Sequence, residues 1–235
     1  MLKMLLVPIV VCCAYAFAGT TNPFEKRTPF QEATITYKIS GTSEGTSTLY
    51  VKAYGNYLSE HEQTTMSMFG MDKKTDRLTL VTPEWIYTVD LDTRTGTKVS
   101  NFETYMQQEY TKLSPKEQKT VRRNARKMGT DFSRGLGGRI KFNAAMIHGY
   151  SCDKTTIAGM TSYTIHNTAV VLKMEGSVMG MSIKKEAVSI DKGAVGRTHF
   201  KLPENINITY DASADAMMKK QAAEMMQRLL HPLFK

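Results

Sequence analysis

The chain has 235 residues, of which 41% are hydrophobic and 23% charged, and its formal net charge at pH 7 is +9. This length corresponds to about one large domain and is sufficient for a sizeable hydrophobic core. After residue 18 no apolar run approaches the roughly 20 residues of a membrane-spanning helix, so we expect no such helix there.

Residues 1–18 have the three parts of an export signal. Lys3 supplies a positive start, an apolar stretch follows, and Ala16-Phe17-Ala18 places small residues at the two positions that a signal peptidase reads. We therefore expect the mature protein to begin near Gly19 and to work in the periplasm. Attachment of a lipid to Cys12 or Cys13 is the alternative.

A polar lead over residues 19–29 precedes a series of short alternating runs. Apolar and polar residues alternate around Ile35, Leu49, Leu80 and Val89, a period of two that is typical of strands with one buried face. Turn-forming glycine, asparagine and aspartate residues separate these runs. Such close spacing permits only antiparallel pairing between consecutive strands.

The middle of the chain predicts helices over residues 101–141. Residues 101–110 form the first, and Ser114, Pro115 and Glu117 have the cap, first-turn proline and capping-box positions of a second helix. The second helix is expected to end at Met128, before Gly129.

This helical insertion is strongly basic. Residues 112–141 contain ten basic and two acidic residues, close to the whole excess of charge in the chain. A focused basic patch attracts anions, so we expect contact with an anionic membrane surface or an envelope protein, and no nucleic acid. A solvated helix face without a partner is the alternative. The residues predicted to make this contact are Lys116, Lys119, Arg122, Arg123, Arg126 and Lys127.

Alternating runs return near Tyr150, and we expect strands over 155–157, 162–166, 169–174, 178–190 and 198–202, with a short edge strand at 206–210. A terminal helix over residues 211–231 carries one apolar face. If the signal is removed, Cys152 is the single remaining cysteine. It cannot form an internal disulfide, and we expect it to be buried.

Three segments carry a family resemblance: ATITYKISG at 33–41 with TLYV at 48–51, HGYSCDK at 148–154, and FKLPEN at 200–205. Together they resemble the LolA/LolB/LppX-like periplasmic superfamily, and most closely a poorly characterised exported family of that fold. The resemblance covers roughly residues 30–210. It implies a single α+β domain over 30–235, mainly an antiparallel β half-barrel, with a helical insertion and a C-terminal helix packed against the sheet.

The resemblance also implies a ligand, because LolA shields acyl chains in its concave cavity. We therefore expect a monomeric carrier for a lipid or other apolar small molecule. Flexible methionines suit such a cavity, because they repack at little cost. The residues predicted to line it are Met66, Met68, Phe69, Met71, Trp85, Tyr87, Met174, Met179 and Met181.

Three alternatives to the carrier remain. The methionines could belong to an ordinary core, the spacing of Met66, Met68 and Met71 also fits Cu(I) binding by thioethers, and an envelope scaffold could grip a protein with no lipid. Catalysis is not expected, because no Gly-x-Ser-x-Gly elbow and no zinc-protease histidine pair occur. Neighbouring residues of Ser151-Cys152-Asp153 would face opposite sides of a strand. We expect no metal and no cofactor.

Overall fold

The computed structural model describes residues 28–68, 71–135, 138–178 and 180–231. The predicted signal peptide, nearly all of the polar lead, Phe69 and Met179 lie outside these residues. The strands are β1 (Glu32–Gly41), β2 (Ser43–Lys52), β3 (Tyr57–Met68), β4 (Met71–Val81), β5 (Trp85–Asp90), β6 (Thr95–Ser100), β7 (Arg139–Ile147), β8 (Tyr150–Ile157), β9 (Met160–Ile165), β10 (Val171–Val178), β11 (Met181–Asp191) and β12 (Asn207–Tyr210).

Within the described residues, all twelve strands join one open sheet in the order β12-β6-β5-β4-β3-β2-β1-β11-β10-β9-β8-β7. Each strand pairs antiparallel with the next within β1–β6 and within β7–β11. We call these two runs the first and the second meander. They are joined by β1 and β11, which also pair antiparallel. The exception is β12, which pairs parallel with β6. The predicted α+β class with a mainly antiparallel sheet is therefore confirmed.

The sheet curls strongly toward one face. Lys185 of β11 forms ion pairs with Glu60 and Glu62 of β3, although β1 and β2 lie between these strands. Three strand spacings amount to roughly 14 Å in a flat sheet. Because side chains stand roughly perpendicular to a flat sheet, these groups would not meet there. We call the face that carries these side chains the concave face, and the opposite one the outer face.

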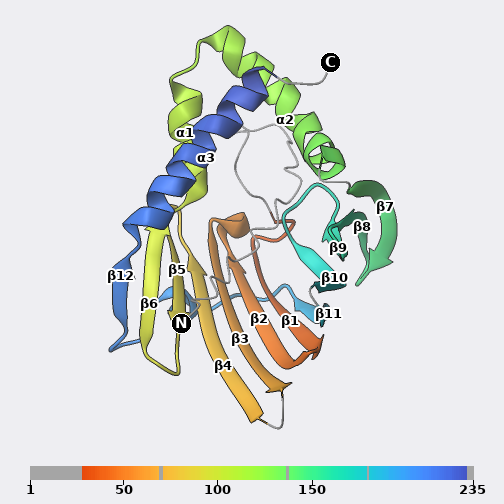
Figure 1. The fold of residues 1–235 in the computed structure, drawn as a ribbon, viewed down its shortest axis with the longest axis vertical. Coiled ribbons are helices and arrows are strands. Elements are labelled where there is room, and N and C mark those ends of the chain that lie inside the picture. Colours follow the sequence, from red (N-terminus) through yellow and green to blue (C-terminus); the bar gives the residue numbers. More distant parts are fainter. Residues whose placement is uncertain (1–27, 69–70, 136–137, 179, 232–235) are drawn as a thin grey trace.

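The helices are α1 (Phe102–Thr111), α2 (Pro115–Gly135) and α3 (Ala212–Leu230). They lie together at one end of the sheet (Figure 1), and none of the described helices has the length and apolar composition needed to cross a membrane. They share a core of their own, made of Met106, Tyr110, Val121, Ala125, Ala222, Met226 and Leu229. Packing of α3 against the sheet was the prediction, but α3 meets the sheet mainly at its first turn, because its apolar face is taken up by α1 and α2.

A second core lies within the curled sheet. Alternate residues of β1, from Ala33 to Ile39, are buried, as the period of two predicts. They pack with residues of the second meander, and Cys152 among them is fully buried, which confirms the expectation for this thiol. The cluster comprises Phe30, Ala33, Ile35, Tyr37, Val51, Cys152, Ile165, Val170, Leu172 and Ala187.

The connection from β11 to β12 crosses the outer face of the first meander. The backbone oxygen of Val195 accepts a hydrogen bond from Lys52, and His199 stacks on Tyr50 with 3.8 Å between ring centroids. The strand predicted over 198–202 is wrong, because Arg197–Phe200 is a 3-10 helix. Its side chains pack onto the sheet from outside instead of extending it.

The helical insertion also differs at its ends. Helix α2 begins at the capping box that was predicted, with Glu117 Oε2 accepting from the Ser114 backbone N–H at 2.8 Å. It continues through Gly129 to Gly135, because an interior glycine costs a helix only about 1 kcal/mol. The insertion ends before residue 141, since β7 begins at Arg139.

Candidate functional site

A polar belt crosses the middle of the concave face. Ser47 Oγ donates to Glu60 Oε1 at 2.6 Å, and Lys185 Nζ donates to the same oxygen and, at 3.4 Å, to Glu62. The Lys185 ammonium also lies 5.0 Å from the ring centroid of Tyr37. Burial opposes ionisation of Glu60, but Lys185 and Ser47 hold its pKa below the ordinary value. Burial, together with the nearby Glu60 charge, raises the pKa of Tyr37.

Between the belt and the helices, the concave face is apolar. Leu58, Val81, Ile86 and Val99 are cross-strand neighbours on β3 to β6, and all four are half-buried. Cross-strand neighbours share one face of a sheet, so these side chains form a continuous apolar row below α1. The next row toward the other end of the sheet consists of Thr79, Thr88 and Thr97, beside Glu60.

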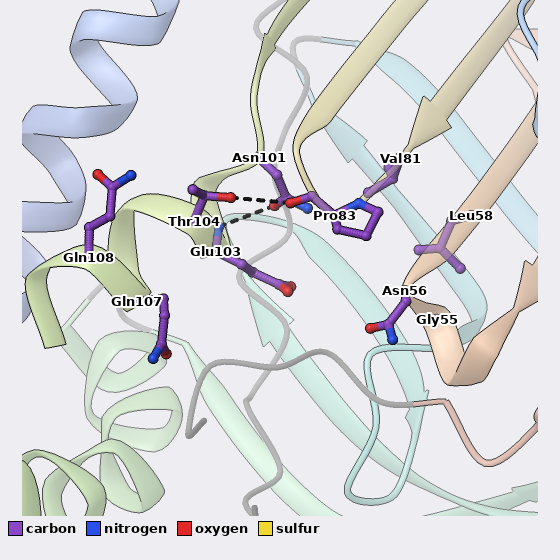
Figure 2. A pocket seen from close by; sticks show the side chains of 10 residues that line it. All are labelled: Gly55, Asn56, Leu58, Val81, Pro83, Asn101, Glu103, Thr104, Gln107 and Gln108. Atoms are coloured by element: carbon purple, nitrogen blue, oxygen red, sulfur yellow. Dashed lines mark hydrogen bonds between the residues drawn. The ribbon is translucent and has the colours of Figure 1, made fainter. Parts of the chain in front are cut away.

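A cleft of about 350 Å³ lies where this apolar row meets α1 (Figure 2). Leu58, Val81 and Pro83 supply its apolar part. Its polar part comes from Asn56 on the loop before β3 and from residues at and after the start of α1. These polar residues are Asn56, Asn101, Glu103, Thr104, Gln107 and Gln108.

Hydrogen bonds hold α1 at this position. The Asn101 side chain caps α1 by accepting from the Glu103 backbone N–H at 3.1 Å, and its amide nitrogen donates to Thr82 O at 2.9 Å. Thr104 Oγ1 donates to Pro83 O at 3.2 Å. These contacts fix the cleft wall. Gln107 Oε1 is buried without a hydrogen-bond partner among the described residues.

The cleft combines an apolar floor with amide and carboxylate groups on its walls. Figure 2 shows the Glu103 carboxylate reaching from α1 toward Asn56. An unpaired buried oxygen such as that of Gln107 costs free energy unless a donor meets it. The arrangement fits a small amphiphile with an apolar part and a hydrogen-bonding group, and its volume is in the usual range for small-molecule sites.

The predicted cavity residues do not share one surface. Strand pairing places Met66, Met174 and Met181 on the concave face. Trp85 and Tyr87 lie on the outer face instead, because they alternate with Ile86 on β5. Lys98 lies 4.5 Å from the centroid of the Trp85 ring.

The methionines also lie away from the cleft. Met66 and Met181 belong to strand ends far from α1 in the register, and Met71, 72% exposed, occupies the same end of the sheet. The Met68 side chain, Phe69 and Met179 lie outside the described residues. Because the Cu(I) hypothesis depends on Met68, it stays an alternative.

The predicted basic contact lies on the exposed face of α2. Val121 and Ala125 are buried in the helical core, and Lys116, Lys119, Arg122 and Arg123 are exposed. Arg122 and Arg123 have no acidic partner among the described residues. The side chains of Arg126 and Lys127 lie outside the described residues.

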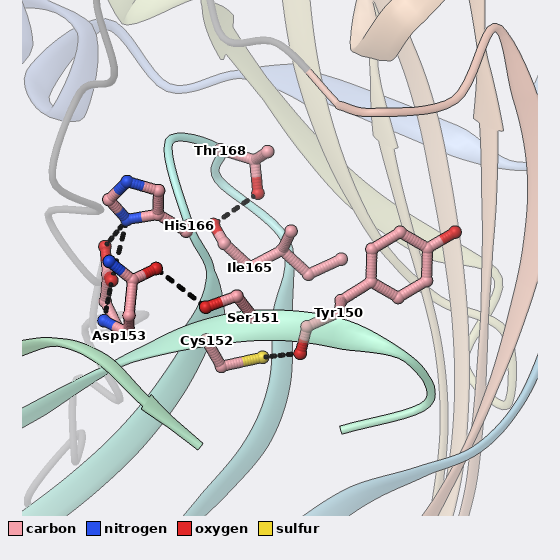
Figure 3. Close-up of polar contacts among 8 residues, drawn as sticks. Tyr150, Ser151, Cys152, Asp153, Ile165, His166 and Thr168 are labelled. Atoms are coloured by element: carbon pink, nitrogen blue, oxygen red, sulfur yellow. Dashed lines mark hydrogen bonds and ion pairs between the residues drawn. The ribbon is translucent and has the colours of Figure 1, made fainter. Parts of the chain in front are cut away.

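A third polar cluster surrounds Asp153, which follows Cys152 on β8 (Figure 3). His166 Nδ1 lies 2.8 Å from Asp153 Oδ1, and Ser151 Oγ donates to Asn143 Oδ1 at 2.7 Å. Burial raises the pKa of the Cys152 thiol, so the thiolate is disfavoured. The hydroxyl of Ser151 is directed to Asn143 and not to the imidazole, so this geometry ties the strands together without presenting an activated nucleophile.

No group of three or more His, Cys, Asp or Glu side chains within the described ranges is placed to hold a metal ion. The belt of Lys185 and Glu60 and the amide-lined cleft had no signal in the sequence analysis. Both depend on residues far apart in the chain, and a glutamate or glutamine on an alternating strand or helix is most often a solvated side chain.

Comparisons with known proteins identify no family. No protein-family model matches the chain, and no curated protein matches it. A structure of an uncharacterised conserved protein from Thermus thermophilus is similar with a TM-score of 0.45 and 8% identity, over 77% of this chain and 91% of that one. A structure of PNGF-II gives a TM-score of 0.35 and 14% identity, over 82% of this chain and 33% of that one.

Proposed function

We propose that this protein is a periplasmic binding protein and carrier for a lipid or other amphiphilic small molecule. The observation that carries the proposal is the cleft of about 350 Å³ between α1 and the apolar row of the concave face. Leu58 and Val81 would contact the apolar part of the ligand. Gln107 and Asn56 would meet its hydrogen-bonding group, which makes the ligand amphiphilic instead of purely apolar.

This proposal moves the expected site from the methionines to the cleft while keeping the LolA-like use of a concave face. Burial of apolar surface supplies affinity at about 25 cal/mol per Å², and the fixed position of α1 limits the entropy lost on binding. The exposed basic face of α2 would serve as an electrostatic contact to an anionic surface, either a membrane or an acidic envelope protein.

Filling the cleft is expected to remove the ligand. In Val81→Trp the indole occupies cleft volume, so a ligand that travels with wild-type protein from its own envelope should be lost. Native mass spectrometry followed by organic extraction measures this. Thr88→Trp is the matched control, because position 88 is exposed on the same face outside the cleft. A ligand retained equally by both variants would place binding elsewhere, and wild-type protein without a ligand would favour the scaffold alternative.

Charge reversal on α2 is expected to weaken contact with any anionic surface. Arg122→Glu with Arg123→Glu should elute from a cation-exchange matrix at clearly lower salt than Lys219→Glu with Lys220→Glu, which makes the same change in net charge on exposed positions of α3. Screening removes the difference as ionic strength rises. Equal elution of the two double variants would show that α2 is only a solvated face.

A further inference from the structure

The hairpin ends opposite the helices form a second exposed surface. Strands β1 and β3 run in the same direction and end beside the start of β11, because Gly41 pairs with Ile183 and Met66 pairs with Ser43. The β1–β2 turn is held to β11 by a hydrogen bond from the Thr42 N–H to Ser182 O at 2.9 Å. Figure 1 shows the β3–β4 hairpin at the end of the long axis opposite α2 and α3, with the ends of β1 and β2 and of β10 and β11 between it and the helices.

Large apolar side chains are exposed at this end. Met71 at the start of β4 is 72% exposed, and Met181 and Ile183 at the start of β11 are each 37% exposed. These positions belong to two separate hairpins, and each is followed along its strand by a pair of lysines: Lys73 and Lys74 in β4, Lys184 and Lys185 in β11. We call Met71, Met181, Ile183, Lys73, Lys74 and Lys184 the hairpin rim.

The spacing of the rim suits a lipid bilayer. Two to three residues at about 3.3 Å each place Lys73, Lys74 and Lys184 roughly 7–10 Å behind Met71 and Met181. That depth matches the roughly 5–10 Å by which interfacial apolar side chains enter the boundary between head groups and acyl chains. The lysines would then lie at the level of the phosphates. Lys184 pairs with Glu186 at 2.6 Å, and the Asp72 carboxylate accepts from Ser67 at 2.5 Å. Lys73 and Lys74 therefore supply most of the positive charge of the rim.

We propose that the hairpin rim docks on an anionic phospholipid bilayer, with Met71, Met181 and Ile183 inserted and the lysines on the head groups. A flat bilayer at this end leaves α2 on the far side of the molecule (Figure 1). The basic face of α2 is then free for an acidic partner. The two basic surfaces, the hairpin rim and the exposed face of α2, therefore have different occupants. The concave face would open toward the bilayer.

The test is binding of the mature chain, expected from Gly19 onward, to vesicles of phosphatidylglycerol and phosphatidylcholine. Met71→Asp with Met181→Asp should lower the vesicle affinity by more than about tenfold. Met71→Asp alone is compared with Met217→Asp, which adds the same charge, because Met217 on α3 is 53% exposed and lies away from the rim. Part of the wild-type binding should persist in 0.5 M salt, since apolar insertion is not screened. Vesicles of pure phosphatidylcholine should bind less because the lysines lose their partners.

A second measurement locates the contact directly. A polarity-sensitive fluorophore on Met71→Cys should shift to the blue on anionic vesicles, while the same label on Met217→Cys should not. In the mature chain expected from Gly19 onward, Cys152 is the only native cysteine, and it is fully buried and does not compete for the label. Equal affinity of Met71→Asp and Met217→Asp, or loss of vesicle binding on reversal of Arg122 and Arg123 with the rim intact, would overturn the proposal. Neither result depends on a ligand in the cleft.

Discussion

Replacing Asp215 with alanine is expected to lower the free energy of unfolding by about 3 kcal/mol at pH 7, because its carboxylate joins three elements in a buried position. Asp215 is 6% exposed in the first turn of α3. Its Oδ1 accepts from the Ser100 backbone N–H at 2.6 Å at the end of β6, and its Oδ2 accepts from the Tyr105 hydroxyl on α1. Without the carboxylate, the half-buried Ser100 N–H loses this acceptor, and the Tyr105 hydroxyl keeps only Ser100 Oγ at 3.1 Å.

The same contacts give Asp215 a distinct pH dependence. Burial alone would raise the pKa of its carboxyl, but hydrogen bonds from Tyr105, Ser100 and Tyr210 outweigh burial and lower it to about 2. A carboxyl whose folded pKa is lowered stabilises the protein fully above its unfolded pKa and loses that contribution as pH falls toward the folded pKa. The contribution is therefore lost between about pH 4 and pH 2.

Urea unfolding of wild type and Asp215→Asn between pH 7 and pH 2 measures this dependence. The difference in unfolding free energy should shrink as pH falls below 4. At the alkaline end, the hydrogen bond to Asp215 raises the pKa of Tyr210 to about 12, so a shift of that titration in Asp215→Asn gives an independent readout. Asp211→Asn is the comparison: its carboxylate, whose pKa the hydrogen bond from the Ala214 N–H also lowers, caps α3 without joining other elements, so its effect on the unfolding free energy should be smaller. A pH-independent difference would contradict the assignment.

Local patterns predicted the elements whose cause is local. The alternation of β1 and the capping box of α2 depend on residues within one or two turns of each other. Propensity and capping are properties of such short segments. These elements were therefore recognised from the sequence with small errors at their ends.

Strands without a local signal were missed. Strand β3 is a polar run from Tyr57 to Met68 with few apolar positions, so alternation gives no sign of it. Its concave-facing Glu60 and Glu62 are satisfied by Lys185, 123 or more positions away. Strand β7 follows a glycine-rich connection and has a register shift between Lys141 and Ala145, which disrupts the period of two.

The cleft was not found from the sequence for the same reason. A cavity of methionines is a local interpretation, because it groups residues that are close in sequence or similar in type. The cleft is formed by the loop before β3, the start of β3, the end of β4, the β4–β5 loop and α1, which come together only in the folded chain. That Trp85 and Tyr87 share a face could be inferred from alternation, but which face they occupy could not.

Breaking the polar belt is expected to show that a partly buried ion pair holds the curl of the sheet. In Lys185→Met, Glu60 and Glu62 lose their common cation, and we expect the free energy of unfolding at pH 7 to fall by about 2–3 kcal/mol. The side chain of Lys185 is 18% exposed and that of Glu60 is 32% exposed, so the loss should be smaller than for a fully buried pair. Lys184→Met, which breaks the exposed pair with Glu186, should cost less than about 1 kcal/mol.

A double-mutant cycle with Glu60→Gln separates the pair from its surroundings. The glutamine keeps an oxygen that can accept from Ser47 and needs no cation, so Lys185→Met should be much less harmful in the Glu60→Gln background. Because the pKa of Glu60 is lowered in the folded protein, its contribution is present above the unfolded pKa of about 4.5 and is lost as pH falls. The coupling free energy should therefore decline in acid, measured by urea unfolding of all four proteins. A coupling free energy near zero at pH 7 would contradict this role. The curl of the sheet would then be held by the apolar core around β1, and the contact of Lys185 with Glu60 would be a consequence of the curl.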